Sequence, residues 1–212
     1  MPIMGEKMDI QPILPGVWRL QGFVTANRYP ELRASVQSIC QVAKPRHMMT
    51  TRGFSMRVAT TSCGTVGWVS DRSGYRYSET DPETGRRWPA MPGVFLEVAQ
   101  EAARMCEYTD FQPDTCLMNR YEPGVQMGAH QDKDERDFNH PVVSVSLGIP
   151  ARFYIIGEKR TGQSTPIDLA DGDVVVFGGV ARKHYHGVRK LKPAVHESWG
   201  AVRWNLTFRK AL

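Results

Sequence analysis

Cysteine is scarce in this chain of 212 residues, and no two of its four cysteines form a C-x-x-C pair. They are widely separated, at Cys40, Cys63, Cys106 and Cys116. A zinc ribbon needs closely spaced pairs, and disulfide scaffolds are typical of much shorter chains, so this spacing argues against both classes. We therefore expect four reduced thiols in a cytoplasmic protein.

Long apolar runs are also missing from the chain. No stretch approaches the ~20 apolar residues of a membrane-spanning helix, and the first ten residues contain Glu6, Lys7 and Asp9 in place of a signal-peptide core. We find no internal repeat and no low-complexity segment. Without a long apolar run we expect no contact with a membrane. With 212 residues, 41% of them hydrophobic, the chain can bury a sizeable core, which predicts a single domain over residues 1–212.

Two stretches have the periodicity of amphipathic helices. The first begins at Pro30, where proline is tolerated in the first turn, and Pro45 ends it. The second follows Pro92 and ends near Tyr108. Their apolar stripes consist of Leu32, Val36, Ile39 and Ala43 in the first, and of Phe95, Val98, Ala102 and Met105 in the second. Each helix therefore has one face to bury.

Most of the excess positive charge lies in one quarter of the chain. The net charge is +5, and residues 44–91 contain eight lysine or arginine residues against four acidic ones. Glycines alternate there with Trp68, Tyr75, Tyr77 and Trp88, a pattern typical of short hairpins or a mobile flap rather than of a core sheet. The charge fits either a phosphate-contacting surface or a solvated loop face.

From Cys116 onward the pattern changes to short strands. We expect them at residues 116–121, 142–147, 152–156, 174–177 and 201–209, in addition to a strand that carries His130. Residues 1–20 show no clear period, and we expect there an arm that is packed against the body or frayed. Two helices followed by many short strands without a βαβ pattern predict an α+β, mainly β fold, a jelly roll with the helices on one face.

The stretch from Met127 to Asp132 contains a candidate metal site. His130 and Asp132 are two residues apart, and on a β-strand such residues point to the same face. An H-x-D pair supplies two of the three ligands of the facial triad that holds non-haem Fe(II). The pair alone is a weak signal, because a polar strand end that leads into a charged loop has the same sequence.

The third ligand of such a triad is a distant histidine. The downstream candidates are His140, His184, His186 and His196. His184 and His186 share a strand face, so geometry leaves both open, and both could instead be surface or hydrogen-bonded histidines. We favour His186 because Gly187 follows it, and glycine suits a site pressed against neighbouring backbone, whereas the charged pair Arg182-Lys183 places His184 near solvent.

The last predicted strand separates into two faces. Arg203, Asn205, Thr207 and Arg209 alternate with Trp204, Leu206 and Phe208. Two guanidinium groups on one polar face favour an anionic partner, such as a small dicarboxylate. Asn119 and Tyr121 form a second polar pair of this kind. The alternative is an edge strand with solvated arginines, an Asn beside a turn and a Tyr at an interface.

Four groups of residues follow one another in order along the chain. They are Asn119-Arg120-Tyr121, the stretch from His130 to Glu135, Tyr185-His186-Gly187, and the stretch from Arg203 to Arg209. In this combination the chain resembles the bacterial AlkB family of Fe(II)- and 2-oxoglutarate-dependent dioxygenases. The likeness includes Cys63-Gly64, Gly67-Trp68, the stretch from Trp88 to Pro92 and the stretch from Val142 to Gly148. It covers nearly the whole chain beyond residue 45 and implies a double-stranded β-helix, a variant of the jelly roll.

The resemblance implies roles for individual residues. The iron ligands and catalytic residues would be His130, Asp132 and His186. The residues that bind 2-oxoglutarate would be Asn119, Tyr121, Arg203, Asn205 and Arg209. The substrate-contacting residues would be Trp68, Tyr75, Asp134 and Arg160. A nucleotide-recognition flap at about residues 46–91 and a catalytic core at about residues 115–210 would make up the single domain.

The resemblance also implies a reaction. With Fe(II), 2-oxoglutarate and O2, the enzyme would remove methyl groups as formaldehyde from bases such as 1-methyladenine and 3-methylcytosine, and would release succinate and CO2. The expected substrate is methylated DNA, single- or double-stranded, with RNA left open, and the expected state is a monomer. Two alternatives remain: a related dioxygenase that hydroxylates a protein or a small molecule, and a jelly-roll binding module without turnover.

Overall fold

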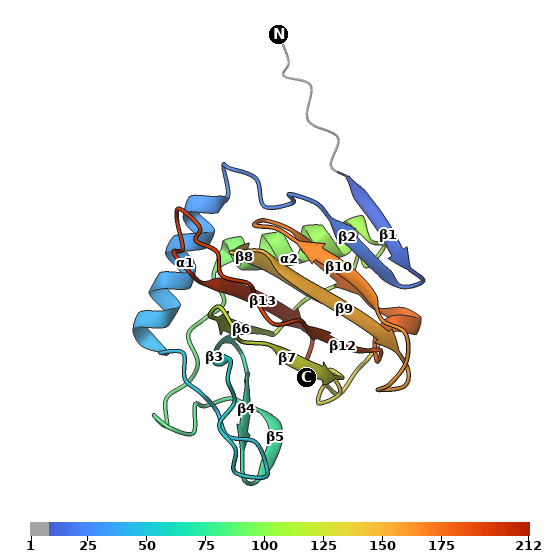
Figure 1. The fold of residues 1–212 in the computed structure, drawn as a ribbon. Helices are drawn as coiled ribbons and strands as arrows, with labels where there is room; N and C mark the ends of the chain where they lie inside the picture. Colours follow the sequence, from blue (N-terminus) through green and yellow to red (C-terminus); the bar gives the residue numbers. More distant parts are fainter. Residues whose placement is uncertain (1–8) are drawn as a thin grey trace.

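A computed structural model describes residues 9–212, and within them thirteen strands predominate over two α-helices (Figure 1). Part of the arm expected at residues 1–20 is instead a β-hairpin, β1 (Ile10–Leu14) and β2 (Val17–Leu20), while residues 1–8 lie outside the described part. Strands this short show no period of their own. Pro12 is tolerated because β1 is the edge strand of its sheet.

Seven antiparallel strands form a large sheet in the order β1-β2-β11-β8-β13-β6-β3. Beyond the hairpin these are β11 (Val174–Phe177), β8 (Val142–Gly148), β13 (Arg203–Arg209), β6 (Thr115–Tyr121) and β3 (Ala59–Gly64). The four strands predicted at residues 116–121, 142–147, 174–177 and 201–209 are thereby confirmed, within a few residues at their ends. The order of strands alternates between distant parts of the sequence, as a jelly roll requires.

A smaller sheet faces the large one. Its order is β10-β9-β12-β7, and its strands are β10 (Thr165–Leu169), β9 (Ala151–Gly157), β12 (Tyr185–Val188) and β7 (Met127–His130). Apolar side chains from both sheets meet between them, among them Phe153 and Ile155 from β9 and Val175 and Phe177 from β11. The predicted jelly roll is therefore confirmed. Strand β10 escaped prediction because only Ile167 and Leu169 mark it as apolar.

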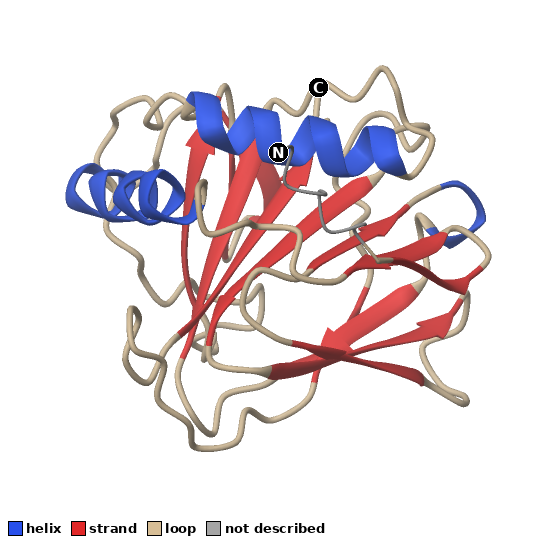
Figure 2. Cartoon of the chain, turned by 90° about the horizontal axis from the view of Figure 1, so that it is seen from above, coloured by secondary structure: helices blue, strands red, loops and turns tan. Residues whose placement is uncertain are grey.

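Two helices, α1 (Tyr29–Val42) and α2 (Gly93–Met105), cover the other face of the large sheet (Figure 2). Both match the predicted helices, and their apolar stripes pack against side chains of β6, β8, β11 and β13. Phe95 of α2, for example, meets Phe208 of β13 edge-to-face, with ring centroids 5.7 Å apart. Within residues 9–212, neither helix has the length and apolar character that a membrane span needs.

The segment over residues 46–88 differs in part from the predicted run of short hairpins. Strands β4 (Gly67–Asp71) and β5 (Gly74–Ser78) do form such a hairpin, which projects from the body (Figure 1). Strand β3, however, is buried and pairs with β6 along its whole length, so the expectation was wrong for this strand. Its Thr60 and Ser62 are buried hydroxyl residues, and a strand so polar gives no core signal in the sequence.

Candidate active site

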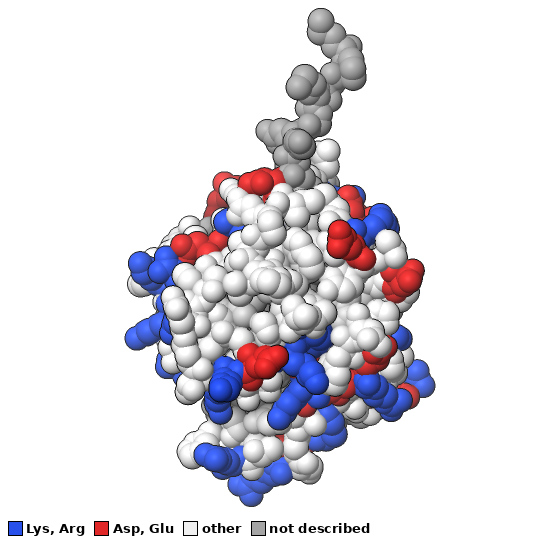
Figure 3. Space-filling view, turned by 90° about the vertical axis from the view of Figure 1, so that its right-hand side faces the viewer, with Lys and Arg blue, Asp and Glu red and all other residues white. Residues whose placement is uncertain are grey.

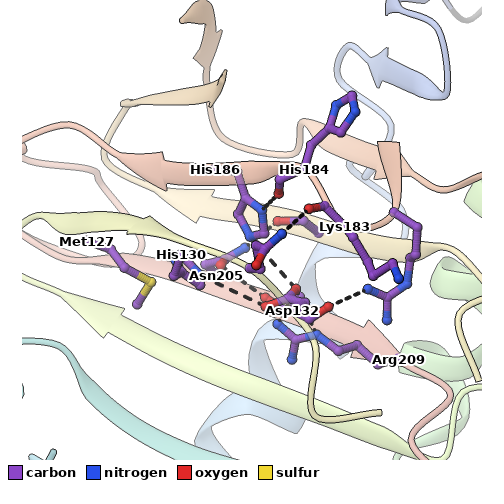
Figure 4. A network of polar contacts seen from close by, with 12 residues as sticks. Met127, His130, Asp132, Lys183, His184, His186, Asn205 and Arg209 are labelled. Atoms are coloured by element: carbon purple, nitrogen blue, oxygen red, sulfur yellow. Dashed lines mark hydrogen bonds and ion pairs between the residues drawn. The ribbon is translucent and has the colours of Figure 1, made fainter. Parts of the chain in front are cut away.

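Three side chains that could hold one metal ion meet between the sheets (Figure 4). His186 of β12 lies directly across the ladder from His130 of β7, which brings the ring centroids within 4.4 Å. Asp132 lies beyond the end of β7, so the same-face rule for strands does not explain its position. The loop instead turns its carboxylate back, with Oδ1 3.9 Å from His130 Nε2 and Oδ2 3.8 Å from His186 Nε2.

Backbone carbonyl groups orient both imidazole rings. His186 Nδ1 is 2.9 Å from the carbonyl oxygen of His184, and His130 Nδ1 is 3.0 Å from that of Gly128. These contacts favour a proton on Nδ1 and leave each Nε2 unprotonated and aimed at the carboxylate. Two histidines held in this way beside one carboxylate form the donor set that selects non-haem Fe(II). The three residues therefore fit such an ion.

The four candidate histidines are separated by their environments. In Figure 4 the ring of His184 points away from the cluster, whereas that of His186 points into it. Gly187 allows β12 to lie close to β7, since a Cβ at this position would lie 2.6 Å from the carbonyl oxygen of Met127. His140 and His196 contact other carboxylates, at Asp137 and Asp171. The structure thus brings His186, and none of the other three, to the H-x-D pair.

Burial and the surrounding charges keep Asp132 and His186 in the protonation states that bind a cation. Burial alone would raise the pKa of Asp132, but the nearby positive groups, Arg209 foremost, hold that pKa below its ordinary value. Arg209 donates from Nε and Nη2 to Asp132 Oδ2, at 3.0 and 2.8 Å. Burial, helped by His130, lowers the pKa of His186 to about 4. At neutral pH the site therefore offers an ionised carboxylate and an uncharged imidazole.

Two further charged residues, Arg182 and Glu135, hold the loop that carries Asp132. Arg182 is buried and donates to the backbone carbonyl groups of Asp132 and His140, at 2.9 and 3.0 Å. It also lies 3.2 Å from Glu135 Oε2, and Arg209 lies 3.4 Å from Oε1 of the same carboxylate. The sequence indicated that Arg182 lies near solvent, and this was wrong, because its guanidinium is buried among these acceptors. We assigned Glu135 no role from the sequence. A charged residue in a polar loop gives no sign there that it is buried.

The metal cluster opens into a cavity of about 560 Å³ between the sheets. Of the residues expected to bind 2-oxoglutarate, Asn119, Tyr121, Asn205 and Arg209 line it. Two lining atoms, Asn119 Oδ1 and Thr60 Oγ1, are buried without a hydrogen-bond partner in the protein. Buried polar atoms almost always have partners, so this part of the cavity fits a polar ligand.

Arg203 lies behind the cavity wall, with its guanidinium 5.1 Å from the ring centroid of Tyr121. One nitrogen, Nη2, donates to Ser146 Oγ at 2.9 Å, while Nε and Nη1 are buried without an acceptor. Burial lowers the pKa of Arg203, which is the sign of a cation that lacks an anionic partner. A carboxylate of a dicarboxylic acid would supply that partner, so the residues present fit 2-oxoglutarate.

The four residues expected to contact substrate line the same cavity. Trp68 and Tyr75, from neighbouring strands of the projecting hairpin, are stacked with ring centroids 5.6 Å apart and planes 10° from parallel. Trp68 Nε1 donates to Asp134 Oδ2 at 2.8 Å, and Tyr77 of the same hairpin donates to Glu135 Oε1 at 2.6 Å. Arg160 lies in an exposed loop after β9. The hairpin is thus bonded to the loop that carries Asp132.

Residues 16–209 match the model of the 2OG-Fe(II) oxygenase superfamily. The alpha-ketoglutarate-dependent dioxygenase AlkB of Escherichia coli strain K12 is 45% identical over 201 residues, which cover 95% of this chain and 93% of that protein. The chain belongs to the AlkB family of Fe(II)- and 2-oxoglutarate-dependent dioxygenases. It is therefore an enzyme whose cofactor is Fe(II) and whose co-substrates are 2-oxoglutarate and O2.

More distant AlkB relatives carry names that state their substrates. The DNA N(6)-methyladenine demethylase ALKBH1C of Arabidopsis thaliana is 33% identical over 174 residues, 70% of this chain and 38% of that one. The tRNA demethylase abh1 of Schizosaccharomyces pombe is 32% identical over 130 residues, 59% of this chain and 42% of that one. The solved structure of OsALKBH1 superposes with a TM-score of 0.82 at 28% identity, covering 95% of this chain and all of that one.

The first prediction separates the two neighbouring histidines. His186→Ala should abolish metal binding, measured from the visible absorption of bound Co(II), together with Fe(II)-dependent consumption of 2-oxoglutarate. Loss of a direct ligand should exceed the about 10- to 100-fold loss typical of an outer-shell change. His184→Ala is the matched control and should retain both properties, because its side chain points away from the cluster. The opposite pattern would show that His184 is the ligand.

Proposed function

We propose that this enzyme demethylates alkylated bases of the 1-methyladenine and 3-methylcytosine type in DNA, and so repairs alkylation damage by direct reversal. One observation supports this proposal most strongly. The His130–Asp132–His186 cluster lies in a cavity that also contains stacked aromatic rings and the cations Lys133 and Arg160. A protein or small-molecule substrate would give these aromatic and basic residues no evident use.

In this proposal His130, Asp132 and His186 hold Fe(II), which supplies, with 2-oxoglutarate and O2, the oxidising power to hydroxylate an N-methyl group. Arg203 binds one carboxylate of 2-oxoglutarate through its unpaired Nε and Nη1 groups. Arg209 lies beside Asp132 at the metal end of the cavity. The remaining contacts to the co-substrate come from Asn119, Tyr121 and Asn205. The hydroxymethyl product collapses to formaldehyde and the repaired base.

A methylated base must leave its stack to enter this cavity. We infer that residues 46–91 act as a nucleotide-recognition flap, over a catalytic core at residues 115–210, and that Trp68 stacks on the flipped base. The carboxylate of Asp134 favours bases that become cationic on methylation, as 1-methyladenine and 3-methylcytosine do. Arg160 and Tyr75 line the same cavity and are exposed to solvent, which fits contact with the backbone of the flipped nucleotide.

The substrate class draws support from the relatives, whose names specify DNA in one case and tRNA in another. We therefore propose DNA as the main substrate and methylated RNA as a second one. The four cysteines are free in the structure, and three of them are buried, which fits the reducing cytoplasm. We propose that the enzyme acts there as a monomer.

The second prediction tests the function itself. Iron-loaded protein with 2-oxoglutarate should lower the mass of a single-stranded DNA oligonucleotide that contains 1-methyladenine by that of one CH2 group. It should release one formaldehyde per succinate. The His186→Ala protein is the control for background chemistry. Consumption of 2-oxoglutarate without any change in the mass of methylated DNA or RNA would favour a protein or small-molecule substrate, and no consumption would favour a binding module.

The third prediction concerns Arg203. Arg203→Lys should raise the 2-oxoglutarate concentration needed for half-maximal turnover by about tenfold or more, because lysine cannot offer a planar two-pronged donor to a carboxylate. Affinity for a methylated oligonucleotide, measured by fluorescence anisotropy, should stay nearly unchanged. Arg209→Lys should have the same direction of effect, with added loss of metal binding since Arg209 also pairs with Asp132. Normal co-substrate affinity with weak oligonucleotide binding would reject the assignment.

The fourth prediction concerns Trp68. Trp68→Ala should lower turnover of methylated DNA by a factor of about 5 to 150, because base–aromatic stacking contributes ~1–3 kcal/mol. Slow consumption of 2-oxoglutarate without substrate should persist, since the metal ligands come from other segments. Trp68→Phe keeps a stacking ring but loses the hydrogen bond to Asp134, and so separates the two contributions. If Trp68→Ala cannot bind iron or 2-oxoglutarate, Trp68 is a structural residue instead.

A further inference from the structure

A tight loop lies beside the projecting hairpin and presents Phe54 at its surface. The loop closes through hydrogen bonds from the N–H of Thr50 to the carbonyl of Phe54, at 2.8 Å, and from the N–H of Gly53 to the carbonyl of Thr50, at 2.9 Å. Gly53 has φ of 81°, a left-handed conformation that glycine adopts without strain. Ser70 of β4 donates to the carbonyl of Met49, which fastens the loop to the hairpin. Phe54 is therefore held on a fixed turn.

The exposure of Phe54 is unusual for its type. Its relative exposure is 70%, and within residues 9–212 Tyr75, at 44%, is the one other aromatic residue that is exposed. Tyr75 lines the cavity, where the proposed function uses it. An exposed phenyl ring on an ordered loop is unfavourable in water, because roughly 25 cal/mol per Å² of apolar surface is left unburied. The ring of Phe54 is therefore available for contact with a binding partner.

The charge around Phe54 indicates what that partner is. The four acids of residues 44–91 are all paired, Asp71 with Arg76, Glu79 with Arg87, and both Asp81 and Glu83 with Arg46. In the described part of the chain no acidic group pairs with Arg52, Arg57 or Arg72. Lysine and arginine side chains gather at the end of the molecule that carries this hairpin (Figure 3).

Two of these cations lie at the loop that carries Phe54. Arg52 precedes Phe54 by two residues, and the guanidinium of Arg72 comes within 3.8 Å of where a Cβ of Gly53 would be. Met56 and Arg57, which follow Phe54, line the cavity itself. Phe54 and Met56 are two residues apart, so their Cα atoms lie at most about 7 Å from each other. Phe54 therefore lies within the length of one or two nucleotides of the cavity, for a strand that rises about 3.4 Å per base.

We propose that Phe54, Arg52 and Arg72 form a second contact for the damaged strand, outside the cavity. Phe54 stacks on a base that flanks the flipped nucleotide, and the two arginines contact the adjacent phosphates. The combination of an exposed ring with unpaired cations matches the way in which proteins bind single strands without sequence preference. This proposal rests on the proposed function, because it assumes that a methylated nucleic acid occupies the cavity. It adds that affinity depends on strand length.

The test compares a methylated nucleoside monophosphate, which ends before Phe54, with a methylated 13-nucleotide strand. With iron-loaded Phe54→Ala protein, KM for the 13-mer should rise by about 5- to 150-fold, the equivalent of one lost stacking contact. KM for the monophosphate should change less than about twofold, because no base reaches Phe54. Phe54→Trp should restore the long-strand KM, whereas Phe54→Leu, apolar but without a ring face, should not. Val195→Ala shortens a residue that is 82% exposed elsewhere on the surface and should change neither.

The arginines are tested by salt dependence. Arg52→Gln and Arg72→Gln should each lower the salt slope of 13-mer binding by about one counterion. The Phe54→Ala loss should be equal on single strands and on duplexes, since the stacked base belongs to the damaged strand. A normal 13-mer KM in Phe54→Ala, an equal loss on the monophosphate, or a loss confined to duplexes would each overturn this proposal. Failure of the unaltered protein to demethylate any of these substrates would instead overturn the proposed function.

Discussion

The buried carboxylate of Asp132 is the constraint on which the arrangement of the surrounding residues depends. Taking a carboxylate out of water costs several kcal/mol unless cations and hydrogen bonds replace the lost hydration. Here the replacement comes from Arg209 of β13, which donates twice to the carboxylate, and from Arg182, which donates to the backbone carbonyl of the same residue. His130 and His186 of the smaller sheet lie beside the carboxylate, so Asp132 is held between residues of both sheets. The metal site is therefore also the place where the two sheets are joined.

The large sheet can serve this site because its two faces differ. On β13 the apolar Trp204, Leu206 and Phe208 belong to the core beneath the helices, while Asn205, Thr207 and Arg209 line the cavity. The same alternation runs along β6 and β8. Helix packing thus supplies one hydrophobic core. The opposite face carries the cavity's polar residues beside a second apolar cluster, which fills the rest of the space between the sheets. Strand β3 extends the polar face with Thr60.

Four residues of the loop after β7 connect the metal site with the projecting hairpin. Asp132 contacts the histidines, Asp134 accepts a hydrogen bond from Trp68, and Glu135 accepts one from Tyr77 while it pairs with Arg182. Burial raises the pKa of Tyr77 well above its ordinary value, so the phenol stays protonated and keeps donating. The projecting hairpin is therefore hydrogen-bonded to the segment that holds the metal ligand. The hairpin that we propose to recognise the base is thus in contact with the loop of the metal site.

The sequence by itself determined the features that depend on local order. Helical and two-residue periods predicted both helices, most strands and the two faces of β13, and the residue types around His130, His186 and Arg203 indicated a metal and an anion. Only the tertiary structure decided that Asp132 turns back from beyond its strand, that β3 joins the large sheet, and that Arg182 and Glu135 are buried. Those features depend on partners far away in the sequence, as with Arg182 and Asp132, fifty residues apart. No period or local composition records which distant charge will compensate a buried one, because that pairing exists only once the sheets have closed.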